Sequence, residues 1–549
     1  MSPIKALLLP LLLLIAHNVQ AQVAFERILN AADEPHNWLT YSGNYSGNRH
    51  SELDQIEPGN VNDLQLKWVF QAQSLEKFEA TPLVVDGIMY LTEAPNTVTA
   101  LDAKLGRVFW RYEYTPSNQS RPCCGRVNRG LAILGETLFM ATIDAQLIAI
   151  DMVTGQPIWK TAVADPNTGY AMTLAPLIVK DKVVVGVAGG EYGVRGFISA
   201  YEVDTGEEAW RFYTIPGPGE PGHETWEGGG DAWEHGGASV WVTGSYDPEL
   251  NLTYWGIGNP GPDWNPAQRP GDNLYSDSVV ALNADTGELE WYFQFTPNDD
   301  YDYDSVQIPV LVDLDTRVFS SGKLMLWGNR NGFFYVLDRA TGEFIRGNPF
   351  VQVNWASGLD ESGRPIETPQ PAGATTYPCV GGGTNWYSPS YSPDTELFYV
   401  SAWEGCGHVF RPVEVAYLPG QRFLGGRPTY ANPGAPGLPS LFRGPINNWT
   451  ETEGTGAVIA IDPRTGGERW RFNMTDVTTS GILTTASNIV FTGGREGYFY
   501  ALHAETGELL WRTSLGGMIA SGPITYAIDG KQYVTATSGN GLFVFGLRE

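Results

Sequence analysis

The sequence predicts an all-β protein, an eight-bladed β-propeller with tryptophan-docking motifs whose ring is closed by N- and C-terminal strands. Three observations lead to this prediction. Of 549 residues, 65 are Gly and 37 are Pro, aromatic residues make up 12% and charged residues only 17%, which is typical of a β-rich chain with many turns. One eleven-residue pattern recurs along the chain. Strand-like segments lie near the N-terminal and the C-terminal end of the chain.

The recurring pattern reads Ala-x-Asp-x-x-Thr-Gly-x-x-x-Trp. A strand ends at the Asp, Gly permits a tight turn by taking a positive φ, and the Trp of the next strand docks between neighbouring sheets. Steps of 49 and 51 residues between early copies fit one four-stranded blade each, whereas steps of 81 and 124 residues require inserted loops or an unmarked strand. A multidomain β chain is the alternative to this repeat. The copies begin at Ala100, Ala149, Ala200, Ala281, Val336, Ala460 and Ala501.

Seven marked copies leave an eighth blade, which we expect to be composite. The segment "LQLKWVFQ" around Trp68 supplies an early strand, and "QYVTATSGNGLFVFGL" supplies the last ones. Pairing of these segments would close the ring and remove exposed sheet edges.

Two segments differ from the repeats. Residues 1–21 are interpreted as a secretory signal peptide, because one Lys precedes a ten-residue apolar run and a small-residue site that ends at Ala21. We therefore expect a single propeller domain over residues 22–549, exported and soluble in a periplasm. Residues 410–450 are rich in Pro and Gly, and are interpreted as an inserted loop over one face of the ring, with a disordered tether as the alternative.

The net charge of −27 and the sequence pI of about 4.6 exclude two classes of partner. A chain so acidic is not expected to bind nucleic acid or an anionic membrane surface. No later stretch is apolar over a length that spans a bilayer. The sequence also contains no Cys-x-x-Cys-His motif, so no c-type haem is expected on this chain.

Two cysteines, Cys123 and Cys124, are adjacent in the segment "RPCCGRVNRG". Neighbouring Cα atoms lie about 3.8 Å apart, whereas disulfides prefer roughly 5.5–6 Å. The residues alone leave open two free thiols, the ends of two separate bridges, or one strained ring. The four cysteines of an exported chain allow three pairings.

The segment "TPNDDYDYDSV" concentrates acidic residues. A run of this kind is usually a solvated turn. If the segment is extended, however, Asp302 and Asp304 point the same way, and two carboxylates held together attract a hard cation.

These motifs, with the tryptophan repeats, resemble the quinoprotein alcohol dehydrogenases, which use pyrroloquinoline quinone (PQQ) and a metal ion on an eight-bladed propeller. The resemblance runs from about Trp38 to the C-terminus. It implies a disulfide ring of Cys123 and Cys124 against the flat cofactor, and a second bridge from Cys379 to Cys406. The other cofactor-binding residues that it implies are Glu79, Val127, Arg129, Thr173, Ala188, Gly189, Gly190, Ser239, Trp241, Arg330, Asn385 and Trp386.

The resemblance also implies a metal site formed by Glu191, Asn259, Asp302 and Asp304. Calcium-type members generally lack a carboxylate at the position of Asp304, whereas lanthanide-type members have one. A trivalent ion requires more negative charge, so a lanthanide(III) ion is favoured over Ca²⁺.

By the same resemblance, Asp302 is the general base that takes the proton of a small alcohol, and hydride passes to metal-bound PQQ. A separate cytochrome c is the expected electron acceptor, and a homodimer remains open. Thr479 stands where many alcohol-oxidising members carry Trp, so a PQQ-dependent sugar or polyol dehydrogenase is the alternative. A non-catalytic propeller scaffold would share the repeats but has no reason to keep the site residues together.

Overall fold

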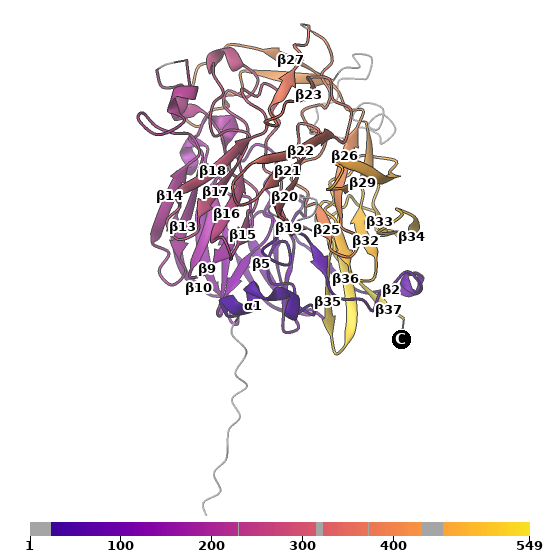
Figure 1. The fold of residues 1–549 in the computed structure, drawn as a ribbon. Helices are drawn as coiled ribbons and strands as arrows, with labels where there is room; N and C mark the ends of the chain where they lie inside the picture. Colours follow the sequence, from indigo (N-terminus) through magenta and orange to yellow (C-terminus); the bar gives the residue numbers. More distant parts are fainter. Residues whose placement is uncertain (1–22, 229, 315–321, 372, 431–453, 549) are drawn as a thin grey trace, which may run out of the picture.

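The computed structural model describes residues 23–228, 230–314, 322–371, 373–430 and 454–548 (Figure 1). The predicted signal peptide (1–21) and the second part of the predicted Pro/Gly-rich loop (431–450) lie outside the described residues. In the part of the chain that is described, no helix is long and apolar enough to cross a membrane.

The described strands form eight blades of four antiparallel strands each, as the repeat predicts. In chain order the blades consist of β3 (Leu83–Val85), β4 (Ile88–Glu93), β5 (Thr97–Asp102) and β6 (Val108–Glu113); β7 (Ala132–Leu134), β8 (Thr137–Ala141), β9 (Gln146–Asp151) and β10 (Pro157–Ala162); β11 (Leu177–Val179), β12 (Lys182–Gly186), β13 (Phe197–Glu202) and β14 (Glu208–Tyr213); β15 (Ser245–Asp247), β16 (Leu252–Gly256), β17 (Ser278–Asn283) and β18 (Leu289–Gln294); β19 (Val310–Asp313), β20 (Lys323–Gly328), β21 (Phe333–Asp338) and β22 (Phe344–Pro349); β25 (Ser390–Ser392), β26 (Leu397–Glu404), β29 (Thr455–Asp462) and β30 (Gly467–Asn473); β31 (Leu483–Thr485), β32 (Ile489–Gly493), β33 (Tyr498–His503) and β34 (Leu509–Ser514); and β2 (Leu64–Gln71) with β35 (Ile524–Ile528), β36 (Lys531–Ser538) and β37 (Gly541–Leu547).

The last blade confirms the predicted closure of the ring. β2 is the segment "LQLKWVFQ", and it pairs antiparallel with β37, with Leu64 opposite Leu547 and Gln71 opposite Gly541. In Figure 1 the indigo strand β2 lies beside the yellow strand β37. The two inner strands of this blade, β37 and β36, therefore each have a hydrogen-bonded neighbour on both sides.

The tryptophan docking is confirmed in atomic detail. The turn glycine of a repeat adopts a positive φ and lies against the Trp of the preceding blade; at Gly155 (φ +71°), a Cβ atom would stand 2.5 Å from the Trp110 ring. The same contact joins Gly206 to Trp159 and Gly287 to Trp210. A side chain at these glycines would therefore displace the ring that holds two blades together.

The longer repeat steps carry insertions, as predicted. Between β22 and β26 the chain adds the hairpin β23 (Ala356–Leu359) and β24 (Pro365–Glu367), and the sixth blade is interrupted by β27 (His408–Pro412) and β28 (Gly426–Tyr430). Figure 1 shows β23 and β27 at one end of the molecule and helix α1 (Phe25–Leu29) at the opposite end. The short 3₁₀ helices are η1 (Ala31–Asp33), η2 (Val61–Asp63), η3 (Pro166–Thr168), η4 (Gly190–Tyr192), η5 (His223–Thr225), η6 (Ala232–His235) and η7 (Pro266–Gln268), and β1 (His50–Ser51) pairs in parallel with β31.

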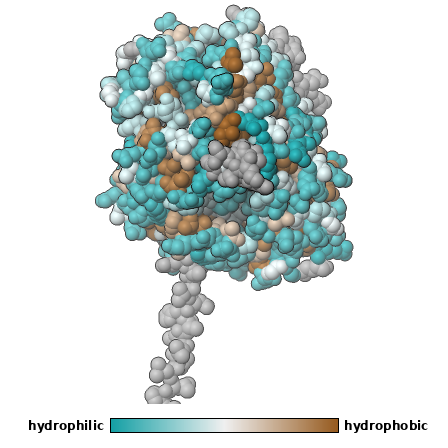
Figure 2. Space-filling view, in the orientation of Figure 1, coloured by the Kyte–Doolittle hydropathy of each residue, from teal (hydrophilic) through white to brown (hydrophobic). Residues whose placement is uncertain are grey.

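The surface in Figure 2 is largely hydrophilic, and its apolar residues form small separate groups. The exposed apolar side chains of the described residues include Leu75, Leu105 and Ile158, which belong to different parts of the chain. The face shown in Figure 2 therefore presents no broad apolar area for a partner among the described residues.

Candidate active site

Several of the predicted site residues lie at one structural position, the loop that leads into the first strand of a blade. Arg129 precedes β7, Thr173 precedes β11 and Trp241 precedes β15. Asp304 likewise precedes β19. The first strands of neighbouring blades contact one another, as β7 and β11 do, and the residues before them therefore converge around the propeller axis.

Arg129 is the centre of one half of the site. Arg129 is 5% exposed. Its guanidinium forms an ion pair of 2.9 Å with Glu79 and donates a 2.9 Å hydrogen bond to the Thr173 hydroxyl. The guanidinium carbon also lies 5.0 Å from the ring centre of Trp241 and 4.6 Å from that of Trp386. The structure thus places four predicted cofactor residues around a fifth, the buried cation Arg129.

The adjacent cysteines form the predicted disulfide ring, with their Cα atoms 3.8 Å apart. The second predicted bridge, Cys379–Cys406, is also present. The sulfur of Cys124 lies 3.8 Å from Oε1 of Glu191, so the ring stands next to a predicted metal ligand. Both alternatives, free thiols and two separate bridges, are excluded for Cys123 and Cys124.

The small residues before Glu191 permit a close approach of backbone segments. Gly189 has φ +121°, and a Cβ atom on it would lie 2.4 Å from the carbonyl oxygen of Gly169. A Cβ on Gly190 would lie 3.3 Å from the Ser239 hydroxyl oxygen. Ala188 pairs with Ala171 in an isolated bridge. The run therefore places Glu191 and Ser239 in one compact part of the site.

The two aspartates of the acidic segment meet at Arg330. Its guanidinium lies 3.5 Å from Asp302 Oδ2 and forms a short ion pair with Asp304 Oδ2. Asp304 Oδ1 accepts a 3.0 Å hydrogen bond from the backbone N–H of Asn259. Asp302 has φ +63°, so the segment is not an extended strand and the alternation assumed from the sequence is wrong. The side chains still converge because Arg330 binds both.

The predicted metal ligands Asp302, Asp304 and Asn259 are neighbours, but the carboxylate oxygens of Glu191, Asp302 and Asp304 do not all lie within 4.8 Å of one another. Among the described residues, the groups with three ligand atoms within 4.8 Å of one another include Cys123, Cys124 and Glu191, and do not include Glu191, Asp302 and Asp304 together. Arg330 occupies the space between the two aspartates.

Three further residues that the sequence analysis named have the following surroundings. Val127 is buried, and Asn385 donates a 3.1 Å hydrogen bond from its side chain to the Gly381 carbonyl. The Thr479 hydroxyl donates to the Ile519 carbonyl at 3.2 Å. The hydroxyl of Thr479 is therefore already held by the neighbouring backbone.

Two acidic side chains of the site, Asp302 and Glu191, have raised pKa values. Burial raises the pKa of Asp302 well above its usual range; Arg330 opposes this, while Asp304, Asp263 and Glu191 add to it. Burial, and after it the charge of Asp304, raises the pKa of Glu191 to about 7. Bringing a cation to these groups would favour their charged forms.

This arrangement predicts how the stability of the metal-free protein depends on pH. The folded pKa of Glu191, about 7, lies above its ordinary value of 4.5, so the folded protein binds this proton more tightly than the unfolded chain does. The free energy of unfolding should therefore fall as pH rises from 4.5 through 7. Thermal unfolding of chelator-treated protein should give a lower Tm at pH 8 than at pH 5, and added metal should reduce the difference. An equal or higher Tm at pH 8 would contradict the prediction.

Sequence reasoning missed a buried acidic network behind the site. Asp263 is 1% exposed and Asp277 is fully buried. Burial is the first cause that raises the pKa values of both well above their usual range. The fully buried Arg269 donates to the Asp263 and Asp299 backbone carbonyls. The only sequence signal for this network is the crowding of Asp and Pro in "GNPGPDWNP" and "RPGDN".

Part of the predicted Pro/Gly-rich loop also lies against the site. We call residues 413–425 the strap. Its Phe423 backbone N–H donates a 2.7 Å hydrogen bond to the Glu191 carbonyl, and Arg422 donates to the Cys123 carbonyl at 3.4 Å. The described part of the loop therefore packs against Glu191 and the disulfide ring.

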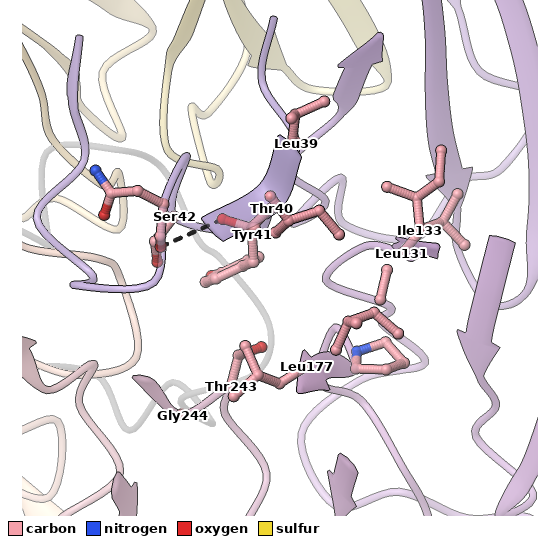
Figure 3. Close-up of a pocket in the computed structure, with 14 residues that line it drawn as sticks. Leu39, Thr40, Tyr41, Ser42, Leu131, Ile133, Leu177, Thr243 and Gly244 are labelled. Atoms are coloured by element: carbon pink, nitrogen blue, oxygen red, sulfur yellow. Dashed lines mark hydrogen bonds between the residues drawn. The ribbon is translucent and has the colours of Figure 1, made fainter. Parts of the chain in front are cut away.

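A separate pocket is lined by residues 39–42, by Asn44 and by segments near β7, β11 and β15 (Figure 3). Its walls include Leu39, Leu131 and Leu177, and they offer no carboxylate, histidine or sulfur ligand. Tyr41, another lining residue, packs in the apolar cluster that also supports Trp241. We therefore interpret this pocket as part of the support beneath the site.

Comparisons with known proteins agree with this geometry. Residues 38–354 match the family described as "Glucose/ethanol/alcohol dehydrogenase, beta-propeller domain", and residues 454–545 match "Outer membrane protein assembly factor BamB". The chain is 39% identical to the quinoprotein alcohol dehydrogenase PedH of Pseudomonas putida, over 96% of this chain and 90% of that protein. It is 38% identical to the lanthanide-dependent methanol dehydrogenase of Methylacidiphilum fumariolicum, over 94% and 87%.

A solved structure, the europium-containing methanol dehydrogenase, superimposes with a TM-score of 0.85 at 34% identity and covers 95% of this chain and 100% of that chain. The match extends over the whole propeller, and the site residues implied by the resemblance stand in the loops where the blades meet. With the vicinal disulfide ring in place and relatives of this similarity across nearly the full chain, the protein belongs to the PQQ-dependent alcohol dehydrogenase family.

Proposed function

We propose that this chain is a periplasmic dehydrogenase that oxidises a small alcohol to the aldehyde, with metal-bound PQQ as the oxidant and a cytochrome c as the electron acceptor. The observation that carries the proposal is the convergence of Asp302, Asp304 and Arg330 beside Asn259. A base, a cation and oxygen ligands for a metal are thereby assembled at one place.

The residues fit the proposed cofactor. PQQ is a flat quinone with carboxylate groups, and it requires planar surfaces, cations and hydrogen-bond donors. Trp241 offers an aromatic face, and Arg129 and the Thr173 hydroxyl offer polar contacts beside it. The disulfide ring supplies a second surface next to Glu191.

The residues also fit a hard metal ion. Glu191, Asn259, Asp302 and Asp304 all offer oxygen ligands, which Ca²⁺ and lanthanide(III) ions prefer. Three of the four are carboxylates, and a bound cation would favour the charged forms of Glu191 and Asp302, whose pKa values are raised. The number of carboxylates supports lanthanide(III) over Ca²⁺.

The protein's own part in the reaction follows from these contacts. When bound, PQQ supplies the two-electron acceptor for hydride, and the metal supplies a Lewis acid. Asp302, in its ionised form, takes the hydroxyl proton of the alcohol. Arg330 stabilises the ionised carboxylates and is positioned to stabilise negative charge near them. The strap is hydrogen-bonded to the backbone of Glu191 and Cys123 and so covers part of this side of the site.

A reconstitution experiment tests the proposal. Metal-free protein is mixed with PQQ and with LaCl₃, CaCl₂ or no metal, and reduction of an artificial dye is followed with ethanol, methanol, glycerol or glucose. We expect activity with a primary alcohol that requires metal and is higher with lanthanum. Equal activity without metal would overturn the mechanism, and a preference for glucose or glycerol would establish a sugar or polyol dehydrogenase instead.

A further inference from the structure

The guanidinium of Arg330 is bound by a backbone oxygen as well as by the two aspartates. Its Nε donates a 3.0 Å hydrogen bond to the Val380 carbonyl, and its Nη2 donates a short one to the same oxygen. Nη1 pairs with Asp304 Oδ2, and Nη2 lies 3.5 Å from Asp302 Oδ2. Because a guanidinium is planar and its N–H directions are fixed, the Val380 carbonyl sets the orientation of the whole group against the proposed base.

The segment that contains Val380 folds closely around Arg330. The Gly383 N–H donates a 2.9 Å hydrogen bond to the Arg330 carbonyl, and the Gly382 N–H donates a 2.8 Å hydrogen bond to the Cys379 carbonyl. Gly382 has φ +78°, and a Cβ atom on it would collide with Cγ of Arg330. The turn of residues 379–383 therefore contacts both the backbone and the side chain of Arg330.

Two side-chain anchors hold this turn. Cys379 is bound to Cys406 by the second disulfide, and Nδ1 of His408 accepts a 3.2 Å hydrogen bond from the Val380 N–H. The two sulfur atoms and a ring nitrogen of His408 all lie within 4.8 Å of one another. His408 begins β27, and its backbone exchanges hydrogen bonds of 2.8 and 3.1 Å with that of Thr376. Val380 is thus held at its N–H by His408 and binds Arg330 through its carbonyl.

The protonation state of His408 suits this contact. A backbone N–H can only donate, so Nδ1 must carry a lone pair. Burial lowers the pKa of His408 to about 4, which keeps the ring neutral at neutral pH. Cys379, Cys406 and His408 are all buried, so the packed interior holds the anchors in place.

We propose that His408 and the second disulfide form a clamp that positions Arg330 through Val380. The clamp thereby sets where the guanidinium stands against Asp302 and Asp304. Its members are positioning residues, because they act on Arg330 through the backbone of Val380. The inference rests on the proposed function, in which Asp302 is the base, and it gives the inserted β27–β28 hairpin, which carries His408, a part in the reaction.

The test compares His408→Leu with His408→Asn in the full chain. Leu fills the space of the ring without an acceptor, whereas the Asn side-chain oxygen can accept from the Val380 N–H. We expect kcat for alcohol-dependent dye reduction with PQQ and LaCl₃ to fall at least about ten-fold in His408→Leu, because small displacements of a catalytic group are costly. KM for the alcohol should change less, and His408→Asn should restore most of kcat. A kcat of His408→Leu close to that of wild type, or no recovery in His408→Asn, would overturn the inference.

His50→Leu is the matched control. His50 is also buried, burial also lowers its pKa to about 4, and its Nδ1 lies 3.0 Å from the Thr484 hydroxyl oxygen, with which it forms a hydrogen bond. It lies in β1, which pairs with β31, and its hydrogen bond holds Thr484 rather than the turn around Arg330. This variant should melt at a lower temperature but keep kcat near the wild-type value. A loss of kcat as large as that of His408→Leu would show a general effect of losing a buried histidine, and would overturn the inference.

A second measurement needs neither cofactor nor activity. The Tm of the metal-free protein is measured for His408→Leu, for Arg330→Met and for the double variant. Residues that share one hydrogen-bond network are not additive, so His408→Leu should lower Tm less in the Arg330→Met background than in wild type. Equal losses in the two backgrounds would overturn the inference. Should His408→Leu not fold, the double variant Cys379→Ala/Cys406→Ala removes the other anchor and takes its place in both measurements. If wild type shows no metal-dependent activity with PQQ, the proposed function fails, and the Tm comparison alone decides the clamp.

Discussion

Asp302→Asn is expected to lower kcat for alcohol-dependent dye reduction by about 100- to 10,000-fold, the usual contribution of a general base. Asn has nearly the shape of Asp but cannot accept the hydroxyl proton. Arg330 keeps its ion pair with Asp304 in this variant, so the buried guanidinium is not left unpaired. The loss should therefore arise from the missing base rather than from unfolding.

Two measurements separate these causes. PQQ binding, followed by absorbance, should remain close to that of wild type, and raising the pH should not restore activity because Asn does not ionise. Asp300→Asn, in the same segment, should keep activity near the wild-type level. Activity of Asp302→Asn within ten-fold of wild type would show that another group takes the proton.

Asp304→Asn is expected to abolish lanthanum-dependent activity while leaving calcium-dependent activity measurable. The substitution removes one negative charge, and the loss is more severe for a trivalent ion. The side-chain oxygen can still accept the hydrogen bond from Asn259 N–H, and Arg330 retains Asp302 as an ionic partner. The local fold should therefore survive.

The measurement is the ratio of activities with LaCl₃ and CaCl₂ at saturating PQQ. For wild type this ratio should exceed one, and for Asp304→Asn it should fall below one. Circular dichroism and Tm serve as controls for folding. A lanthanum response equal to that of wild type would remove Asp304 from the metal site.

The blades could be predicted from sequence because their cause is local. The Thr-Gly turn and the Trp four residues later repeat in sequence, and most of the turn glycines meet the Trp of the neighbouring blade, as Gly155 meets Trp110. The composite blade could be predicted because the two segments that form β2 and β37 lie outside the seven marked copies and can pair with each other. The resemblance added the disulfide ring, whose motif is a contiguous run of letters.

The acidic network could not be predicted, because its chemistry depends on burial. Asp263 stands in a Pro- and Gly-rich turn, where an Asp is normally solvated and caps the backbone. Only the packed fold shows that Asp263 is 1% exposed. Burial, and then the charges of Glu191 and Asp304, raise its pKa. The positive φ of Asp302 was equally hidden, since a two-residue spacing does not reveal the backbone conformation.

The pairing of β2 with β37 also sets an order of events during synthesis. Residues 64–71 emerge early and must wait for residues 541–547, more than four hundred positions later, before the ring can close. The predicted site residues lie in loops of many blades, so a chain that ends before residue 541 holds most of them on a ring that is still open. Closure of this last seam therefore completes the scaffold that fixes their relative positions.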